Sequence, residues 1–287
     1  INPYRGCEHG CIYCFARPTH AFHDLSPGLD FESRLFAKPD AAKLLRVELA
    51  KRNYKVAPLA IGTNTDGYQP IEREWGITRS IVEVLAETKH PLLITTKSDR
   101  LLRDIELLAA MARDNLVGVA ISVTTLDAAL ARTLEPRAPH PRRRLAAIRS
   151  LIDAGVPTQV NISPIIPAIT DHEIEAIMAA AAEAGAIRAS YILMRLPFEV
   201  APLFRAWLAA HYPDRADKVM HMVQDIRGGR DNDPDFFTRM KGHGVWAQLI
   251  RTRVKRAARE HGMNRSFPPI RSDLFLPPER DGQMELF

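Results

Sequence analysis

The sequence predicts an α/β fold: a partial (βα)6 barrel of parallel strands and helices, followed by a helical extension and an extended tail. Three observations support this prediction. Short apolar runs alternate with amphipathic segments at intervals of about thirty residues, as in βα units. One face of the predicted strands carries small and polar residues, and the alternation ends after Leu196. With 287 residues, of which 46% are hydrophobic, the chain is long enough to enclose one large core.

The predicted elements follow one another regularly up to Leu196. The predicted strands are 58–63, 91–96, 116–124, 157–163 and 189–196. The predicted helices are 40–52, 77–88, 100–113, 141–154 and 171–184. A further strand ahead of the first cysteine would make about six βα units, too few to close an eight-stranded barrel.

The chain divides into three predicted parts. Residues 1–197 form the barrel, residues 198–262 form the helical extension, and residues 263–287 form a proline-punctuated tail. No apolar run is long enough to cross a membrane, and the first ten residues lack the apolar core of a signal peptide. Clustered cysteines suit a reducing compartment, so we expect a cytoplasmic protein with no membrane partner. Because the chain begins at Ile1, we also expect sequence upstream of it.

The polar strand faces predict an active site at one end of the barrel. Successive strand residues point to opposite faces, so Gln159, Asn161 and Ser163 share one face. In βα barrels the active site lies at the carboxyl ends of the strands. The residues that we expect to gather there are Thr63, Lys97, Thr124, Ser163 and Arg195.

Cys7, Cys11 and Cys14 are the only cysteines, and they lie within a window of eight residues. An odd, clustered set cannot form a disulfide framework, whereas thiolates bind soft metals and iron–sulfur clusters. A tetrahedral zinc site would need one more ligand, from His9, His20 or His23. A cubane cluster on three cysteines instead keeps one iron free for another molecule. The residues alone leave these two alternatives open, together with three unligated cysteines in the core.

The C-x3-C-x2-C spacing, placed directly before a six-unit βα pattern, resembles the radical S-adenosylmethionine (radical SAM) superfamily over roughly residues 2–197. The resemblance implies that Cys7, Cys11 and Cys14 hold a 4Fe–4S cluster whose open iron binds S-adenosylmethionine. It also implies reductive cleavage of that molecule to a 5'-deoxyadenosyl radical. The implied electron donor is of the flavodoxin or ferredoxin type.

The same resemblance assigns cofactor contacts to further positions. The residues implied are Gly62, Thr63 and Asn64 in AIGTNTD, Lys97, Ser122, Asn161, and Tyr13 against the adenine. Lys97 would neutralise the methionine carboxylate, and Ser122 would bind the carboxylate or the ribose. The alternatives are an ordinary loop lysine and a packed strand serine.

Within the superfamily, four segments resemble uncharacterised proteins related to spore photoproduct lyase, often described as DNA-repair photolyase-like. They are INPYRGCEHGCIYCFARP, GTNTDGYQP, LEPRAPHPRRRLAAI and LMRLPFEV. Two positions differ from spore photoproduct lyase: residues 62–66 contain no hydrogen-donating cysteine, and Phe15 stands where that lyase has a tyrosine. The resemblance therefore implies a repair-like lyase without implying that enzyme's route of thymine-dimer reversal.

Arg137 and Arg195 are the candidate contacts for an anionic substrate. Their alternative role is an internal ion pair, for instance between Glu135 and Arg195, because a buried charge needs a partner. Asp66 is expected either to face the substrate or to cap the following turn.

Charge and the C-terminus favour a DNA partner. The net charge is +5, and Arg251, Lys255 and Arg259 form one basic stripe on a predicted helix. Three consecutive arginines at 142–144 add a second basic cluster. The final residues QMELF resemble the peptide that binds the bacterial sliding clamp, through Gln283, Met284, Leu286 and Phe287. The alternative is an apolar tail that folds back on the barrel.

The leading prediction is a radical SAM enzyme that acts on DNA. One alternative is radical modification of a protein, peptide or RNA. The other is a non-catalytic iron–sulfur or zinc-binding module.

Overall fold

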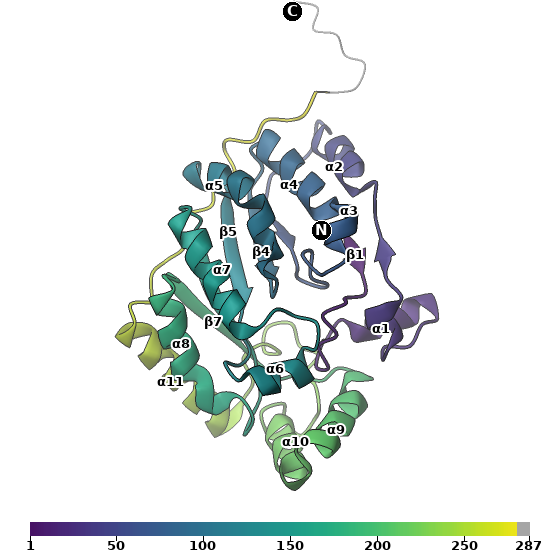
Figure 1. Cartoon of the computed structure of the whole chain (residues 1–287), viewed down its shortest axis with the longest axis vertical. Coiled ribbons are helices and arrows are strands. Elements are labelled where there is room, and N and C mark those ends of the chain that lie inside the picture. Colours follow the sequence, from purple (N-terminus) through teal and green to yellow (C-terminus); the bar gives the residue numbers. More distant parts are fainter. Residues whose placement is uncertain (280–287) are drawn as a thin grey trace, which may run out of the picture.

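The computed structural model describes residues 1–279, and a parallel sheet of five strands forms its centre (Figure 1). The strands are β3 (Leu59–Ile61), β4 (Leu92–Thr96), β5 (Val117–Ser122), β6 (Thr158–Ile165) and β7 (Arg188–Leu193). Neighbours in sequence are also neighbours in the sheet, in the order β3-β4-β5-β6-β7. All five carboxyl ends therefore lie at the same end of the sheet. The predicted α/β fold class is confirmed.

Helices return the chain between the strands. Five of them lie close to the predicted ranges, whereas the short helices at 72–75 and 128–134 are not among the predicted ones. The helices are α2 (Ala41–Leu49), α3 (Glu72–Trp75), α4 (Ile77–Glu87), α5 (Ile105–Arg113), α6 (Ala128–Leu134), α7 (Pro141–Asp153) and α8 (Ile174–Glu183). Helix α7 begins at Pro141, a first helical position where the missing N–H of proline costs nothing. The Nδ1 atom of His140 caps this helix by accepting a hydrogen bond of 3.1 Å from the backbone N of Arg142.

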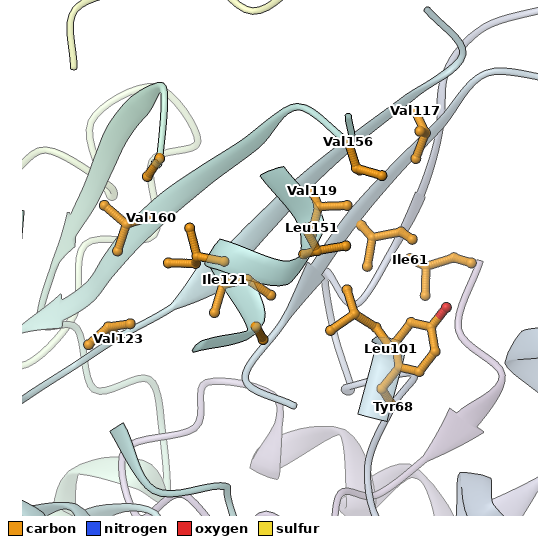
Figure 2. Packing of buried hydrophobic residues seen from close by; sticks show 14 of the residues in the cluster. Ile61, Tyr68, Leu101, Val117, Val119, Ile121, Val123, Leu151, Val156 and Val160 are labelled. Carbon is orange, nitrogen blue, oxygen red and sulfur yellow. The ribbon is translucent and has the colours of Figure 1, made fainter. Parts of the chain in front are cut away.

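The main core lies between the helices and the apolar face of the sheet. Val119 and Ile121 of β5 and Val160 of β6 are fully buried in one cluster with Leu151 of α7 (Figure 2). Side chains alternate along a strand, so the polar residues between these positions point to the other face. That face is available for a site, as the sequence predicts.

The strand ahead of the cysteines does not join the parallel sheet. It is β1 (Tyr4–Arg5), which pairs antiparallel with β2 (Phe36–Ala37). The expected count of about six βα units is therefore corrected to five parallel strands and this separate pair within residues 1–279. Gly6 has φ +76° and turns the chain directly after β1. A Cβ atom there would lie 2.7 Å from the carbonyl oxygen of Phe31. A short helix, α1 (Asp30–Ser33), lies in the connection between β1 and β2.

After β7 the chain forms three helices, α9 (Val200–His211), α10 (Ala216–Asp225) and α11 (Gly244–Glu260). Helices α9 and α10 lie against each other at one end of the molecule (Figure 1). Phe204 and Trp207 of α9 share a buried cluster with Cys11 and Tyr13, so this extension packs on the cysteine loop. Helix α11 packs on α8.

Residues 264–279 contain no helix and run along the amino-terminal ends of the strands. The backbone N of Leu276 donates to the carbonyl of Thr88 at 2.8 Å, and that of Arg271 donates to the carbonyl of Asn115 at 3.0 Å. This segment thus covers the end of the sheet opposite α6 and α9 (Figure 1). The predicted clamp-binding residues Gln283, Met284, Leu286 and Phe287 lie outside the described residues. No helix formed by residues 1–279 is long and apolar enough to span a membrane.

Candidate active site

A cavity of about 330 Å³ lies at the carboxyl ends of the strands, between the sheet and the cysteine loop. Most of the predicted site residues line it. They are Cys7, Cys11, Tyr13, Cys14, Gly62, Thr63, Asn64, Lys97, Ser122, Asn161 and Arg195. Ser163 also lines the cavity, whereas Thr124 lies behind the wall and Arg137 lies outside it.

A buried arginine holds the cysteine loop in shape. Arg17 is 2% exposed, and its guanidinium donates to the carbonyls of Gly10 and Cys11, both at 2.9 Å. It also donates to the carbonyls of Pro27 at 3.0 Å and Gly28 at 2.8 Å. One side chain therefore satisfies carbonyls on two separate segments and fixes the loop between Cys11 and Cys14.

Arg137 braces the same loop from outside. Its guanidinium donates to the carbonyl of Glu8, and to the carbonyl of Glu32 at 3.0 Å. It also lies 3.4 Å from the carboxylate of Glu32. These contacts lie outside the cavity and agree with the alternative role predicted for Arg137, an internal tether, while the substrate contact stays a prediction. Nearby carbonyl and carboxylate oxygens already occupy this guanidinium.

The three thiols face one cavity and are largely withdrawn from solvent. Burial raises the pKa of Cys11 to about 12 and raises that of Cys7 well above its usual range. A buried thiol stays protonated unless a metal binds the thiolate. Within residues 1–279, no three His, Cys, Asp or Glu side chains stand close enough to hold a single metal ion. All three cysteines line the cavity of about 330 Å³, and thiolates are the ligands of iron–sulfur clusters.

Glu135 is the centre of a buried polar network behind the cavity. Its carboxylate accepts hydrogen bonds from the hydroxyl of Tyr13, from Thr124 Oγ1 at 2.7 Å, and from Arg144. Burial alone would raise the pKa of Glu135, but Arg144 and Lys97 lower it to about 2. The network therefore holds a carboxylate in its charged form.

Tyr13 is oriented by this network. Its hydroxyl is bound to Glu135 and lies 3.2 Å from Thr124 Oγ1, while its ring lines the cavity. Because the hydroxyl is held from behind, the ring presents a fixed apolar surface beside Cys14. This position is compatible with the predicted packing against an adenine.

Lys97 places its ammonium between Glu135 and the cavity. Its Nζ lies 4.0 Å from the carboxylate of Glu135, which is already paired with Arg144, and 5.7 Å from the centre of the Tyr13 ring. Burial alone would lower the pKa of Lys97, but Cys11, when it is a thiolate, and the Glu135 carboxylate raise it. The ammonium is therefore retained, and the structure leaves room for an anion beside it.

The end of β3 requires a glycine. Gly62 has φ +86°, and a Cβ atom there would lie 1.8 Å from the carbonyl oxygen of Thr95. Glycine is required here because the backbone of β3 lies close to Thr95 in the neighbouring strand β4. Asp66 then fixes the following turn, because its carboxylate accepts hydrogen bonds from Tyr68 N at 2.9 Å and Lys97 N at 2.8 Å. Asp66 caps this turn and also lines the cavity.

Polar groups continue along the inner face of the sheet. Ser122 is buried at the cavity wall, and its carbonyl accepts from Arg144 at 3.2 Å. The Asn161 side-chain oxygen accepts a hydrogen bond from Ser190 Oγ at 3.2 Å. Their neighbours Ile121 and Ile162 lie in the main core, as the predicted alternation requires.

Arg195 does not pair with Glu135, the alternative partner predicted from sequence. Its guanidinium lies 4.5 Å from the centre of the Phe15 ring, and no carboxylate within residues 1–279 forms an ion pair with it. Glu135 is already occupied by Arg144, which approaches from α7. The charge of Arg195 therefore stays available at the cavity.

The three arginines at 142–144 do not form one basic patch. Arg142 is exposed, Arg143 pairs with Asp99 at 2.6 Å, and Arg144 is buried against Glu135. Helix geometry explains the difference, because Arg144 shares its face with buried Ala147 and Ile148. This spacing is the sequence signal that could have revealed Arg144. Arg17, which the sequence also failed to reveal, carries no comparable signal.

Comparisons with known proteins agree with this geometry. Residues 1–181 match the model of the Radical SAM superfamily. An uncharacterised protein of Mycobacterium tuberculosis is 37% identical over 226 residues, which are 78% of this chain and 66% of the relative. This chain therefore spans slightly less than two thirds of that relative's length.

Solved structures of spore photoproduct lyase share the fold. A cysteine-to-serine mutant has a TM-score of 0.63 at 16% identity, covering 94% of this chain and 74% of that chain. A double mutant with bound AdoMet and dinucleoside spore photoproduct has a TM-score of 0.60 at 16% identity, with the same coverage. The family match over more than half of the chain shows that this protein belongs to the radical SAM superfamily, whose enzymes use a 4Fe–4S cluster and S-adenosylmethionine.

Proposed function

We propose that this protein is a radical SAM enzyme that acts on DNA in a repair-like lyase reaction. The main supporting observation is that the three cysteines and the polar strand ends line one cavity. When bound, the 4Fe–4S cluster and S-adenosylmethionine supply a one-electron cleavage that yields methionine and a 5'-deoxyadenosyl radical. The protein's own contribution is to bind, orient and shield these groups.

Each part of the cavity has a proposed role in holding the cofactors. Cys7, Cys11 and Cys14 ligate the cluster. Lys97 binds the methionine carboxylate, because its ammonium faces the cavity with its one carboxylate neighbour already paired with Arg144. The end of β3 at Gly62, Thr63 and Asn64 offers backbone carbonyls to the amino group, as free strand ends do.

The remaining lining residues complete this site. Ser122 and Asn161 supply polar atoms for the carboxylate or ribose, and the Tyr13 ring packs on the adenine. The apolar residues Ile192 and Leu193 of β7, together with Met194, line the cavity, and their proposed role is to keep water and competing hydrogen donors away. A flavodoxin or ferredoxin type protein is the proposed electron donor.

Charge and likeness to a DNA-repair enzyme support DNA as the substrate. Arg251, Lys255 and Arg259 of α11 are exposed, and none of them forms an ion pair within the described residues. Such a stripe suits phosphates. The structurally similar spore photoproduct lyase binds a dinucleoside spore photoproduct. A proposed cytoplasmic location is consistent with a DNA substrate.

The proposal is tested with anaerobically reconstituted protein and a chemical reductant. We expect ultraviolet-irradiated DNA oligonucleotides to raise the rate of 5'-deoxyadenosine formation above that with undamaged DNA, RNA or peptides. A variant with Arg251, Lys255 and Arg259 changed to Gln should keep the DNA-free rate and lose much of the stimulation. Stimulation by RNA or peptides but not by DNA would contradict the proposed substrate and favour the alternative enzyme.

A further inference from the structure

Two arginines, one lining the cavity and one directly before a lining residue, have no acidic partner within residues 1–279. Arg195 lines the cavity directly after β7, and its guanidinium stacks 4.5 Å from the centre of the Phe15 ring. Phe15 follows Cys14, so this charge stands beside the cysteine loop. No hydrogen bond or ion pair within residues 1–279 involves the Arg195 guanidinium.

Arg239 has a second guanidinium that lies over an aromatic ring and forms no ion pair within residues 1–279. Its Cζ lies 4.7 Å from the centre of the Phe236 ring, and its Nε is buried without a hydrogen-bond partner. The adjacent residue, Met240, lines the cavity. A buried N–H without an acceptor destabilises the protein. A bound ligand that supplies an acceptor for Arg239 Nε would remove this cost.

The backbone fixes Arg239 beside Arg195. The backbone N of Leu193 donates to the carbonyl of Met240 at 3.3 Å. Arg227 donates to the carbonyls of Met194 at 3.0 Å and Arg239 at 2.7 Å, and thereby ties the loop to the end of β7. Burial and then the nearby Arg239 lower the pKa of Arg195, in agreement with two cations held close together.

The aspartates of the same loop are engaged elsewhere. Asp231 pairs with Arg205 at 2.9 Å, and Asp233 accepts from the hydroxyl of Thr238 at 2.6 Å. Asp235 accepts from the backbone N of Phe237 at 2.7 Å. The loop therefore carries acidic side chains without using them to neutralise Arg239.

We infer that Arg195 and Arg239 form an anion-binding subsite at the mouth of the cavity, and that it takes a phosphodiester group of a nucleic-acid strand. This inference rests on the proposed function and extends it to a named contact. Each guanidinium lies over a phenylalanine ring, and its paired N–H donors match the geometry of phosphate oxygens. A phosphodiester held there places its neighbouring nucleotide at the cavity, next to Cys14.

Exposed aromatic rings beside the subsite favour a nucleic acid over an acidic peptide. Phe236 is 69% exposed and Phe237 is 83% exposed, and their rings pack edge to face. Phe198, which follows Arg195 by three residues, is 79% exposed. Arginines interleaved with exposed rings suit the phosphates and bases of a single strand.

The test measures binding of a short fluorescein-labelled single-stranded DNA to the reconstituted protein by fluorescence anisotropy at several salt concentrations. The variants are Arg239→Gln and Arg195→Gln, with Arg230→Gln as the control, because Arg230 is an exposed arginine of the same loop. We expect each subsite variant to weaken binding by about tenfold or more and to reduce the salt slope by about one. The control should bind as the wild type does.

A chemical substitution in the DNA sharpens the test. Neutral methylphosphonates are placed at one linkage at a time. In the wild type, one position should weaken binding. In Arg239→Gln the same position should cause a smaller loss, because only Arg195 still contacts that linkage. Equal binding by Arg239→Gln and Arg230→Gln would overturn the subsite, and so would wild-type binding to acidic peptides but not to DNA.

Formation of 5'-deoxyadenosine without DNA is measured on the same samples. If the wild type forms none, the proposed function fails, whatever the anisotropy shows. If it forms 5'-deoxyadenosine while the variants bind DNA like the control, the subsite alone fails.

Discussion

Glu135 and Arg144 form an ion pair in which both side chains are only 1% exposed, and this pair joins the cysteine loop to the strand ends. Glu135 holds the hydroxyl of Tyr13, and Arg144 donates to the carbonyls of Pro139 at 2.8 Å and Ser122 at 3.2 Å. Breaking the pair would leave a cation buried without its counter-charge. The wall of the cavity therefore depends on a contact that touches neither cofactor nor substrate.

Replacing Glu135 by Gln should lower the free energy of unfolding by about 3 to 5 kcal/mol, because an unpaired buried charge remains. Urea denaturation of the cluster-free protein measures this loss. Glu260→Gln is the control, since Glu260 is half-exposed in its pair with Arg256 and should cost less than about 1 kcal/mol.

The stability difference between the wild type and Glu135→Gln should depend on pH. The pKa of Glu135 is lowered from 4.5 to about 2 in the folded protein, so its stabilisation is complete above pH 4.5. It is lost as the pH falls towards 2, where the folded carboxylate is protonated. The gap in stability between the wild type and Glu135→Gln should therefore narrow over this range. A gap that stays constant would show that Glu135 is not held in its charged form.

Arg17→Lys should reduce the iron retained per chain more than it reduces the folded structure of the barrel. A lysine has three donors on one atom and cannot span the carbonyls of Gly10, Cys11, Pro27 and Gly28 as the guanidinium does. Iron bound per chain after anaerobic gel filtration measures the effect, with circular dichroism as the check on folding. The exposed Arg132→Lys serves as the control. Iron retention equal to that of the control would refute the positioning role.

Lys97→Met should weaken binding of S-adenosylmethionine by about tenfold to a hundredfold, because a charge-assisted hydrogen bond is lost. The iron content should not change, since Glu135 keeps its partner Arg144. Equilibrium dialysis against labelled S-adenosylmethionine measures the affinity, and the exposed Lys43→Met is the matched control. Unchanged affinity would make Lys97 an ordinary wall residue.

Comparing Gly62→Ala with Gly155→Ala separates the cost of steric overlap from the cost of backbone strain. Gly62 and Gly155 both have positive φ, but a Cβ atom would overlap the Thr95 carbonyl only at Gly62 and would meet nothing within 4 Å at Gly155. Gly155→Ala should cost about 1 to 2 kcal/mol from its left-handed backbone alone. Gly62→Ala should cost clearly more, as measured by urea denaturation. Equal losses would show that β3 and β4 separate easily at this point.

The barrel was predictable because its strands combine an apolar core face with a polar inner face. The strand at 157–163 shows this, since Val160 and Ile162 enter the core while Asn161 reaches the cavity. The sequence predicts that the strand ahead of the cysteines joins the parallel sheet, but it pairs with β2 instead. Its partner, β2, follows the entire cysteine loop, and a two-residue strand has no periodicity to read.

The network behind the site was not predictable in the same way. Tyr13 and Glu135 are 122 positions apart and meet only when the loop after α6 folds over the cysteine loop. Residue type alone also did not reveal the contacts of Arg137, because its partners are mainly backbone carbonyls. The cavity lining was accessible from sequence through motif resemblance, whereas the residues that hold this lining in place depend on long-range contacts.

The most direct test of the central claim is the yield of 5'-deoxyadenosine from anaerobically reconstituted, reduced protein, with iron and sulfide measured on the same sample. We predict about four irons and four sulfides per chain and 5'-deoxyadenosine formation that is lost when Cys7, Cys11 and Cys14 are changed to Ala. A protein that instead carries one fully ligated zinc ion and forms no 5'-deoxyadenosine would contradict the account.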